Sequence, residues 1–174
     1  MNKIIDQSTR RMILNFVVSH PGTSAREVQR SLSLGWGETT YHLEHLLNAT
    51  VLERERAGRR DYFFRADVRP ADRRLLIAFQ SAAERAVLLL LRRRHDLSFS
   101  DLTDQLHMNK STLSFHLKFL MASNIVGVSI VNEIRCYHAE QPARIWELYT
   151  KYRDSWGNRW IDRFTAVFGG LMPD

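Results

Sequence analysis

The side chains best placed for binding chemistry lie between Asn109 and Leu120. On a helix, the leucines at 113, 117 and 120 fall at i, i+4 and i+7, a spacing that predicts a buried stripe. Asn109 or Ser111 would cap this helix at its start. The remaining face offers hydroxyl, ammonium and aromatic groups, from Lys110, Ser111, Ser114, Phe115 and Lys118. Hydroxyl and ammonium groups reach phosphate oxygens and base edges, so this face suits the major groove of DNA.

The same pattern occurs a second time, 74 residues earlier in the chain. The shift brings residues 37–46 onto the stretch above, and the register continues without a gap on both sides. The matched pairs include Val28 and Leu102, His42 and His116, Leu43 and Leu117, Leu46 and Leu120, and Phe63 and Tyr137. Such self-similarity at a fixed period predicts one structural module used twice.

Each copy reads as three helices followed by a hairpin. In the first copy, Ser8 would cap a helix that ends at 20–22, and Thr23 or Ser24 would cap a short second helix. A turn at 34–37 precedes a third helix at 39–49, and the strands of a hairpin flank a glycine turn at 57–60. In the second copy, helices are predicted at 82–94, 101–106 and 110–122, with strands at 127–131 and 134–138. This is the element order of a winged helix-turn-helix.

The predicted fold is therefore mainly α with small β-hairpin wings (α+β), built as two tandem winged helix-turn-helix modules. We divide the chain into a first module (1–68), a linker with a connecting helix (69–80, the helix at 73–80), a second module (81–141) and a C-terminal helical segment (142–174). We call the two hairpins the first wing (51–64) and the second wing (127–138).

The C-terminal segment departs from the repeat, which we expect to end after Pro142. A helix is predicted over 143–168, with Gly157 as a candidate break. Its aromatic residues recur at three-and-four spacing, and the candidates for a dimer interface are Trp146, Tyr149, Tyr152, Trp156, Trp160 and Phe164. An aromatic stripe of this size needs a surface to cover it. It either folds back on its own chain or forms a homodimer interface, and we favour the dimer.

Composition narrows the possible partners and location. The net charge is +6, which favours a polyanion such as nucleic acid. Cys136 is the one cysteine, so no internal disulfide can form and a reducing compartment is expected. Residues 1–11 carry no apolar core typical of a signal peptide, and the longest apolar run, 86–91, is far shorter than the ~20 residues that span a bilayer. We predict a cytoplasmic, nucleoid-associated protein with no membrane contact.

The stretch from Lys110 to Leu120, followed by Asn124-Ile125-Val126, resembles the recognition helix and wing entry of ArsR-like winged helix-turn-helix regulators, archaeal members in particular. The resemblance extends over both modules. It implies a sequence-specific regulator of transcription that binds double-stranded DNA, with the third helix in the major groove and the wing on the flanking backbone or minor groove. By position it assigns DNA contacts to Lys110, Ser111, Thr112, Ser114, Phe115 and Lys118.

The first module departs from this pattern in its third helix. Thr39 stands where the second module has Leu113. The positions equivalent to the DNA-facing set hold Trp36, Gly37, Glu38, Thr40, Tyr41 and Glu44. We retain Thr40 and Tyr41 as DNA-binding candidates, although the two carboxylates would repel phosphates and could accept only from a cytosine amine.

The difference in charge between the two wings is opposite to the difference between the two third helices. The first wing carries Arg54, Arg56, Arg59 and Arg60, whereas the second has Glu133 and Arg135. We therefore expect a division of labour, in which the third helix of the second module reads bases and the first wing contacts phosphates.

Other classes of function are less well supported. His42 and His45 lie roughly on one helix face, but no cysteine or carboxylate cluster accompanies them, and the repeat of His42 at His116 indicates a packing role. Cys136 lies on a wing strand, where a buried structural thiol is commoner than a redox switch. No nucleophile elbow, phosphate loop or paired carboxylates indicate an enzyme, and no residue requires a cofactor. The main alternative is a tandem winged-helix protein–protein adaptor in a chromosome or transcription complex, with the first module as a possible docking surface.

Overall fold

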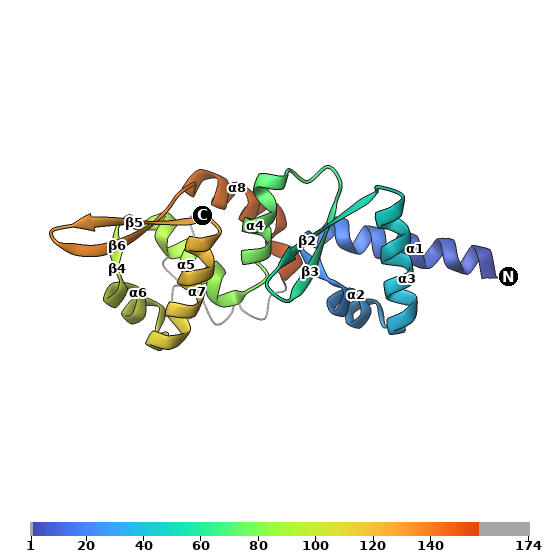
Figure 1. Ribbon diagram of the computed structural model, residues 1–174, viewed down its shortest axis with the longest axis horizontal. Helices are drawn as coiled ribbons and strands as arrows, with labels where there is room; N and C mark the ends of the chain where they lie inside the picture. Colours follow the sequence, from blue (N-terminus) through green and yellow to red (C-terminus); the bar gives the residue numbers. More distant parts are fainter. Residues whose placement is uncertain (1, 157–174) are drawn as a thin grey trace.

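The computed structural model describes residues 2–156 and places two modules of the same design on either side of helix α4 (Figure 1). The first module contains α1 (Asn2–Ser19), β1 (Thr23–Ser24), α2 (Ala25–Leu32), α3 (Trp36–Asn48), β2 (Leu52–Ala57) and β3 (Arg60–Arg65). The second contains α5 (Ala82–Arg93), β4 (Leu97–Ser98), α6 (Phe99–Leu106), α7 (Lys110–Ala122), β5 (Val126–Val131) and β6 (Ile134–Ala139). Every element from β4 to β6 lies 74 residues after its counterpart, which confirms the repeat and the predicted tandem winged-helix fold.

Local signals fix the helix–turn–helix of each module. Ser24 caps α2, and Ser98 caps α6 in a reciprocal capping box with Asp101. Both helices end at a residue in the left-handed conformation, Ser33 with φ 54° and His107 with φ 49°. These two residues are equivalent in the repeat, so both modules turn from the second helix into the third in the same way.

Each wing belongs to a three-stranded antiparallel sheet. The strand orders are β1-β3-β2 and β4-β6-β5, and the long hairpins β2–β3 and β5–β6 extend from each module. The two-residue strands β1 and β4 pair with β3 and β6 and attach each wing to the start of the second helix. The sequence did not predict these two strands, because two residues are too few to show an alternating pattern.

Two hydrophobic clusters form the interior. The boundary between them does not fall at the predicted linker. The first cluster belongs to the first module and contains Ile13, Val17, Val28, Leu43, Leu46, Leu52 and Phe63. The second joins α5, α6, α7 and β6 to the apolar residues 75–79 and to Phe64 of the first wing. The connecting helix, α4 (Pro70–Ala78), is therefore part of the core of the second module.

Charged contacts also hold α4 to its neighbours. Arg73 pairs with Glu53 of the first wing at 2.5 Å, and Arg74 pairs with Glu55 on the same strand. At Gly22, where φ is +82°, a side chain would come within 3.3 Å of the Leu76 carbonyl oxygen and of the Phe64 ring. This close approach and the positive φ explain the glycine, and the first module is packed tightly against α4.

Several predicted boundaries were wrong. The first helix begins at Asn2 rather than after Ser8, because nothing between Asn2 and Gln7 breaks a helix. The third helix begins at Trp36 rather than Thr39, with Gly35 as an extended N-cap and Gly37 inside the first turn. The connecting helix covers 70–78 rather than 73–80, since Pro70 occupies its first turn.

The C-terminal segment also differs from its prediction. Helix α8 (Pro142–Tyr152) passes into a 3-10 turn at Arg153–Trp156, before the predicted break at Gly157. Residues 157–174 lie outside the part of the chain that the structure describes. Moreover, α8 follows the second wing as α4 follows the first, each with Pro in its first turn, so the repeat of elements extends past Pro142. No helix in residues 2–156 is long and apolar enough to cross a bilayer.

Candidate nucleic-acid interface

Helix α7 separates a buried face from an exposed polar face, as predicted. Leu113, Leu117 and Leu120 are at most 1% exposed and pack in the core of the second module. The opposite side exposes Lys110, Ser111, Ser114, Phe115 and Lys118, whereas Thr112 is half-buried. Phe115 has 71% of its surface accessible, the largest value among the exposed apolar residues of the described chain. Six of the proposed contact residues thus lie on one helix, and five of them are exposed.

The first turn of α7 is organised by Asn109. Its side-chain oxygen accepts from the Thr112 backbone N–H and from the Ser111 hydroxyl, both at 2.8 Å. Ser111 therefore keeps an oxygen that can accept a hydrogen bond. Among the described residues, no hydrogen bond or ion pair engages the side chains of Lys110, Ser114 and Lys118, so these groups are available to a ligand.

A polar pair fixes the orientation of α7 on α5. The Nδ1 atom of His116 lies 3.0 Å from Oε1 of Glu84, and both side chains are largely buried. Burial raises the pKa of Glu84, although the contact with His116 acts in the opposite direction. From the sequence we expected a packing role for His116, but its partner Glu84 was not predicted. The repeat could not reveal it, because the equivalent position in the first module is Arg10.

In the first module, the corresponding helix presents a different surface. Thr40 is half-buried and donates its hydroxyl to the carbonyl oxygens of Trp36 and Gly37, at 3.0 and 3.1 Å. Tyr41 and Trp36 are exposed, and the guanidinium of Arg26 lies 5.4 Å from the Trp36 ring. Thr39 is fully buried and donates to the Gly35 carbonyl, so a hydroxyl fills the place of Leu113. Of the two candidates here, only Tyr41 is free to reach outward.

The first wing supplies a cluster of arginines with two different environments. Arg54 pairs with Glu44 of α3 at 2.9 Å, and Arg56 pairs with Asp61 across the hairpin at 3.4 Å. Arg59 and Arg60 lie at the exposed tip, and neither has an ion-pair partner among residues 2–156. The Arg54 contact also compensates the Glu44 carboxylate, which we had expected to repel phosphates.

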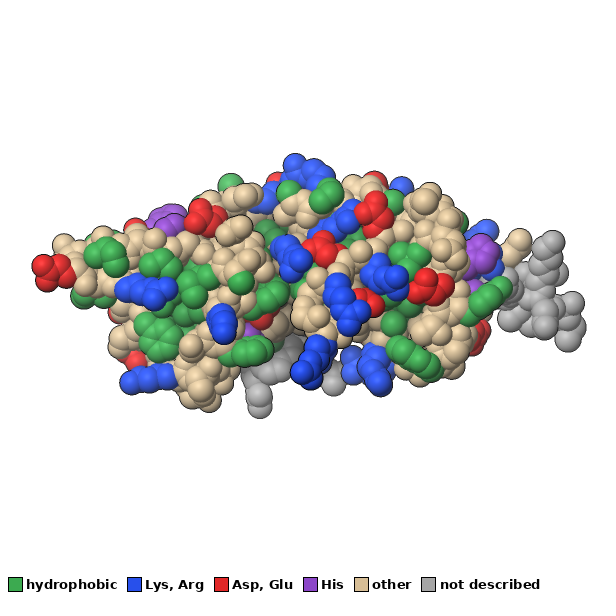
Figure 2. Space-filling view, in the orientation of Figure 1, with side chains coloured by type: hydrophobic (Ala, Val, Ile, Leu, Met, Phe, Trp, Pro, Cys, Tyr) green, Lys and Arg blue, Asp and Glu red, His purple; other side chains and the backbone are tan. Residues whose placement is uncertain are grey.

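The two wings differ strongly in surface chemistry. Figure 2 shows Lys and Arg side chains gathered over the first wing and α4, with carboxylates between them, while hydrophobic side chains occupy much of the end that carries the second wing. The second wing exposes Val128, Ile130, Val131 and Ile134. On this face, the Lys and Arg side chains are most concentrated around the first wing and α4, and only scattered ones lie over the end that carries the second wing.

The aromatic residues of the C-terminal segment pack largely against their own chain. Tyr149 is buried, and Trp156 lies 4.9 Å from the Phe79 ring, centroid to centroid. Trp146 stacks on Tyr149 at 5.8 Å and has the Arg92 guanidinium 4.0 Å from its ring, and Tyr152 is half-buried beside the same cluster. For these four residues, the structure shows the fold-back arrangement that we had placed second. The predicted dimer residues Trp160 and Phe164 lie outside the described residues, and dimerisation through this segment stays a prediction.

The sequence offered two further candidate sites, a redox-active cysteine and a metal site. Cys136 is a buried thiol on β6. Within residues 2–156, no group of three or more His, Cys, Asp and Glu side chains is arranged to hold a metal ion.

Comparison with known proteins agrees with this geometry. Residues 7–76 match the family HTH_HVO_0163_N, an N-terminal HTH domain, and residues 84–128 match the bacterial regulatory protein, arsR family. The chain is 27% identical over 124 residues to an uncharacterized HTH-type transcriptional regulator, MJ1398, of Methanocaldococcus jannaschii. This match covers 71% of the chain and 31% of the relative, so the chain spans about a third of that protein's length.

Among solved structures, the chain is similar to an ArsR family transcriptional regulator, RHA00566. The sequence identity is 22%, the TM-score is 0.37, and the match covers 51% of this chain and 93% of the other. The two family matches fall on the two modules, one on each. The chain is thus a tandem winged helix-turn-helix protein that resembles archaeal ArsR-like regulators, and the match to the arsR family falls within its second module.

Proposed function

We propose that this protein is a sequence-specific regulator of transcription that binds double-stranded DNA, with α7 in the major groove. The exposed face of α7 is the observation that carries the proposal. It combines two unpaired ammonium groups and two hydroxyls with a buried leucine stripe that holds the helix in place. A helix with this surface enters the major groove, where its side chains reach base edges and phosphates.

We assign phosphate contacts to the first wing. Arg59 and Arg60 stand exposed at its tip without carboxylate partners in the described chain, so their charge is available to a phosphate backbone. Arg54 and Arg56 also face solvent but already pair with Glu44 and Asp61. Their contribution is therefore smaller than that of the tip arginines.

A protein–protein adaptor is the second candidate, supported by the surface of α3. Two aromatic side chains, Trp36 and Tyr41, are exposed beside the carboxylates of Glu38 and Glu44. Exposed aromatic groups are typical of protein interfaces rather than of phosphate contacts. This candidate and the DNA-binding proposal are compatible if the first module docks a partner while the second reads DNA.

The oligomeric state belongs to the proposal as well. We retain a homodimer in the cytoplasm as an expectation, but the described aromatic residues of α8 are used within the chain. Sedimentation of the full chain at several concentrations decides between a monomer and a dimer.

The test is selection of random-sequence duplex DNA by the full chain, followed by affinity measurements over a salt series. We expect an enriched motif and a steep negative dependence of log K on log salt. Replacing Lys110 and Lys118 together by Gln should weaken binding about tenfold or more and lower the salt slope by about two.

Lys151→Gln is the matched control, since Lys151 is an exposed lysine on α8, away from α7. Its salt slope should equal that of the wild type. Selection without an enriched motif, or equal losses for the control and the α7 variant, would contradict the proposal and favour the adaptor.

A further inference from the structure

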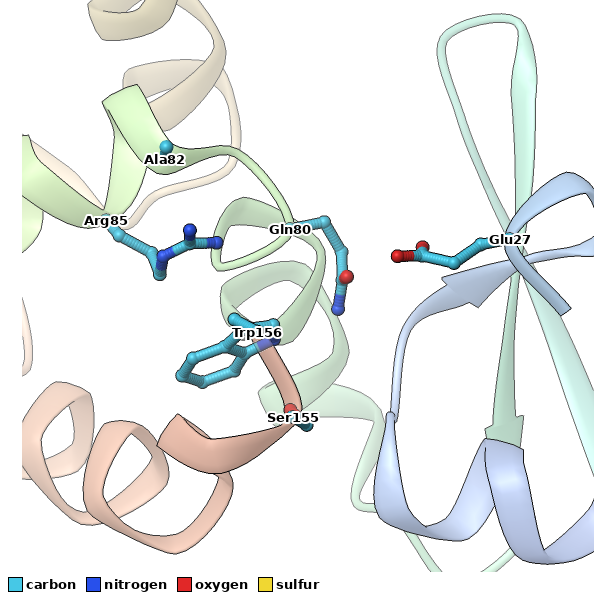
Figure 3. A pocket seen from close by; sticks show the side chains of 6 residues that line it. All are labelled: Glu27, Gln80, Ala82, Arg85, Ser155 and Trp156. Atoms are coloured by element: carbon cyan, nitrogen blue, oxygen red, sulfur yellow. The ribbon is translucent and has the colours of Figure 1, made fainter. Parts of the chain in front are cut away.

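A cavity of about 310 Å³ lies where the first module faces the α4–α5 junction (Figure 3). Its lining comes from both modules: Glu27 of α2, Gln80 and Ala82 at the junction, Arg85 of α5, and Ser155 and Trp156 after α8. The volume is at the lower end of the range typical of small-molecule sites, about 300–1,000 Å³. A space of this size accommodates a small metabolite.

Arg85 provides a cation on one wall. Its guanidinium donates to the Phe79 carbonyl oxygen and lies 5.6 Å from the centre of the Trp156 ring. Burial lowers the pKa of Arg85, and no carboxylate among the described residues pairs with it. A guanidinium withdrawn from water without an anion is costly, so the site favours a negatively charged ligand group.

The ring of Trp156 lines the same wall. Its indole Nε1 is buried and has no hydrogen-bond partner among residues 2–156, so this nitrogen is closed to solvent and does not face the open space. The N–H donors for a carboxylate therefore come from the Arg85 guanidinium, whose fork geometry matches two carboxylate oxygens.

Acceptors occupy the opposite side. Figure 3 shows the Glu27 carboxylate pointing toward Gln80 from the first module. Glu27 accepts only a long bond, 3.4 Å, from the Thr23 hydroxyl. Gln80 donates its amide to the Pro21 carbonyl at 3.0 Å, which leaves its own carbonyl oxygen as an acceptor. These oxygens suit an ammonium group.

We propose that this cavity binds a small zwitterion of the amino-acid class, with its carboxylate on Arg85 beside the Trp156 ring and its ammonium group on Glu27 and Gln80. Glu27 and Arg85 form no direct ion pair, so a ligand that carries both charges satisfies both walls at once. Because these walls belong to different modules, an occupied cavity strengthens the contact between them. The binding itself does not depend on the proposed DNA-binding function, but any effect on DNA affinity rests on it.

The test is thermal unfolding of the full chain with a panel of free α-amino acids and ω-amino acids from glycine to 6-aminohexanoate. Acetate, butyrate and butylamine serve as probes with one charge only. At about ten times the dissociation constant, a bound zwitterion should raise Tm by about 3–6 °C. The singly charged probes should raise it much less, because each satisfies one wall only.

Two variants locate the site. Glu27→Gln and Arg85→Gln should each abolish most of the rise in Tm, while Glu38→Gln and Arg153→Gln, both exposed outside the cavity lining, should keep it. Arg85→Gln also removes a hydrogen bond to the Phe79 carbonyl oxygen and could unfold the protein for that reason. In that case the result for Glu27→Gln alone decides. A panel that leaves Tm unchanged, equal effects of the singly charged probes, or a rise that persists in Glu27→Gln would overturn the proposal. DNA selection is not needed for any of these outcomes, so a failure here is separate from a failure of the proposed function.

Discussion

The two modules share one backbone but expose opposite chemistry. In the second module, a cationic and hydroxyl-bearing helix α7 accompanies a wing with four exposed aliphatic side chains. In the first, an acidic and aromatic helix α3 accompanies a wing rich in arginine. The buried positions have kept the fold while the exposed ones have diverged. On the proposed function, the groups that would contact DNA are divided between the two copies, with the base-reading helix in the second and the phosphate-contacting wing in the first.

The largest expected effect concerns a buried position at which the copies differ. Leu113→Ala should lower the free energy of unfolding by about 2–5 kcal/mol, because it opens a cavity in a closed core. Thr39→Ala, at the equivalent position, should cost only about 1 kcal/mol, the net value of its bond to Gly35. Urea denaturation measures both. Equal losses at the two sites would contradict the view that the two cores differ in how they are filled.

The next effect concerns Asp72, which joins the helix after the first wing to the helix after the second. Burial raises the pKa of Asp72, but hydrogen bonds from Arg144 and Arg69 outweigh it and hold the pKa below its ordinary value of 3.8. A depressed folded-state pKa contributes stability above that ordinary value, and this contribution is lost as the pH falls through the folded-state pKa.

Asp72→Asn should therefore reduce stability by about 2 kcal/mol at pH 7 and by much less near pH 2. Denaturant titrations at the two pH values give the comparison. Asp154→Asn, at an exposed carboxylate 3.8 Å from Arg153, is the control and should change little at either pH. A loss for Asp72→Asn that does not depend on pH would show that the charge contributes nothing.

The third prediction contrasts the wings directly. Replacing Arg59 and Arg60 by Ala should lower the salt slope of DNA binding by about two and weaken binding about tenfold at moderate salt. Ile130→Thr with Ile134→Thr, at the exposed positions of the second wing, should leave the slope unchanged because no charge is lost. An unchanged slope in the arginine variant would remove the first wing from the interface.

The smallest effect tests the hydroxyls of the two third helices. Ser114→Ala should weaken DNA binding by about 1 kcal/mol and relax the sequence preference at one base pair. The reason is that the Ser114 hydroxyl is available to hydrogen-bond a base edge. Thr40→Ala should change affinity by less than about 0.5 kcal/mol, because that hydroxyl already bonds backbone carbonyls of its own helix. Selection profiles of the two variants would reveal a role for α3 if Thr40→Ala also shifted the preferred sequence.

The sequence predicted most of the fold because the signals were local. The leucine stripe of α7 and the serine cap of α2 each depend on residues close together in the chain. The 74-residue register then shows that both copies carry the same pattern. The boundaries failed where a local signal was misleading. Gly35 and Gly37 resembled a turn, yet Gly35 caps α3 and Gly37 lies within it.

The sequence could not predict the contacts between residues that are far apart in the chain. Nothing near Glu84 indicates that it meets His116, and nothing in the aromatic spacing of α8 distinguishes a dimer surface from packing against Phe79. The lining of the cavity likewise combines Glu27 with Trp156, which are far apart in the chain. Which exposed side chains are already occupied, such as Arg54 by Glu44, also depends on the fold.

The position of α4 in the core of the second module bears on how the two contacted segments of a DNA target must be spaced along the duplex. Because α4 is packed with one module and ion-paired to the wing of the other, the first wing and α7 are held at a fixed separation and rotation. B-DNA turns once in about 10–10.5 base pairs. A target contacted by both elements would therefore tolerate base changes between its two segments far better than an insertion of half a turn, which moves one segment to the opposite side of the duplex.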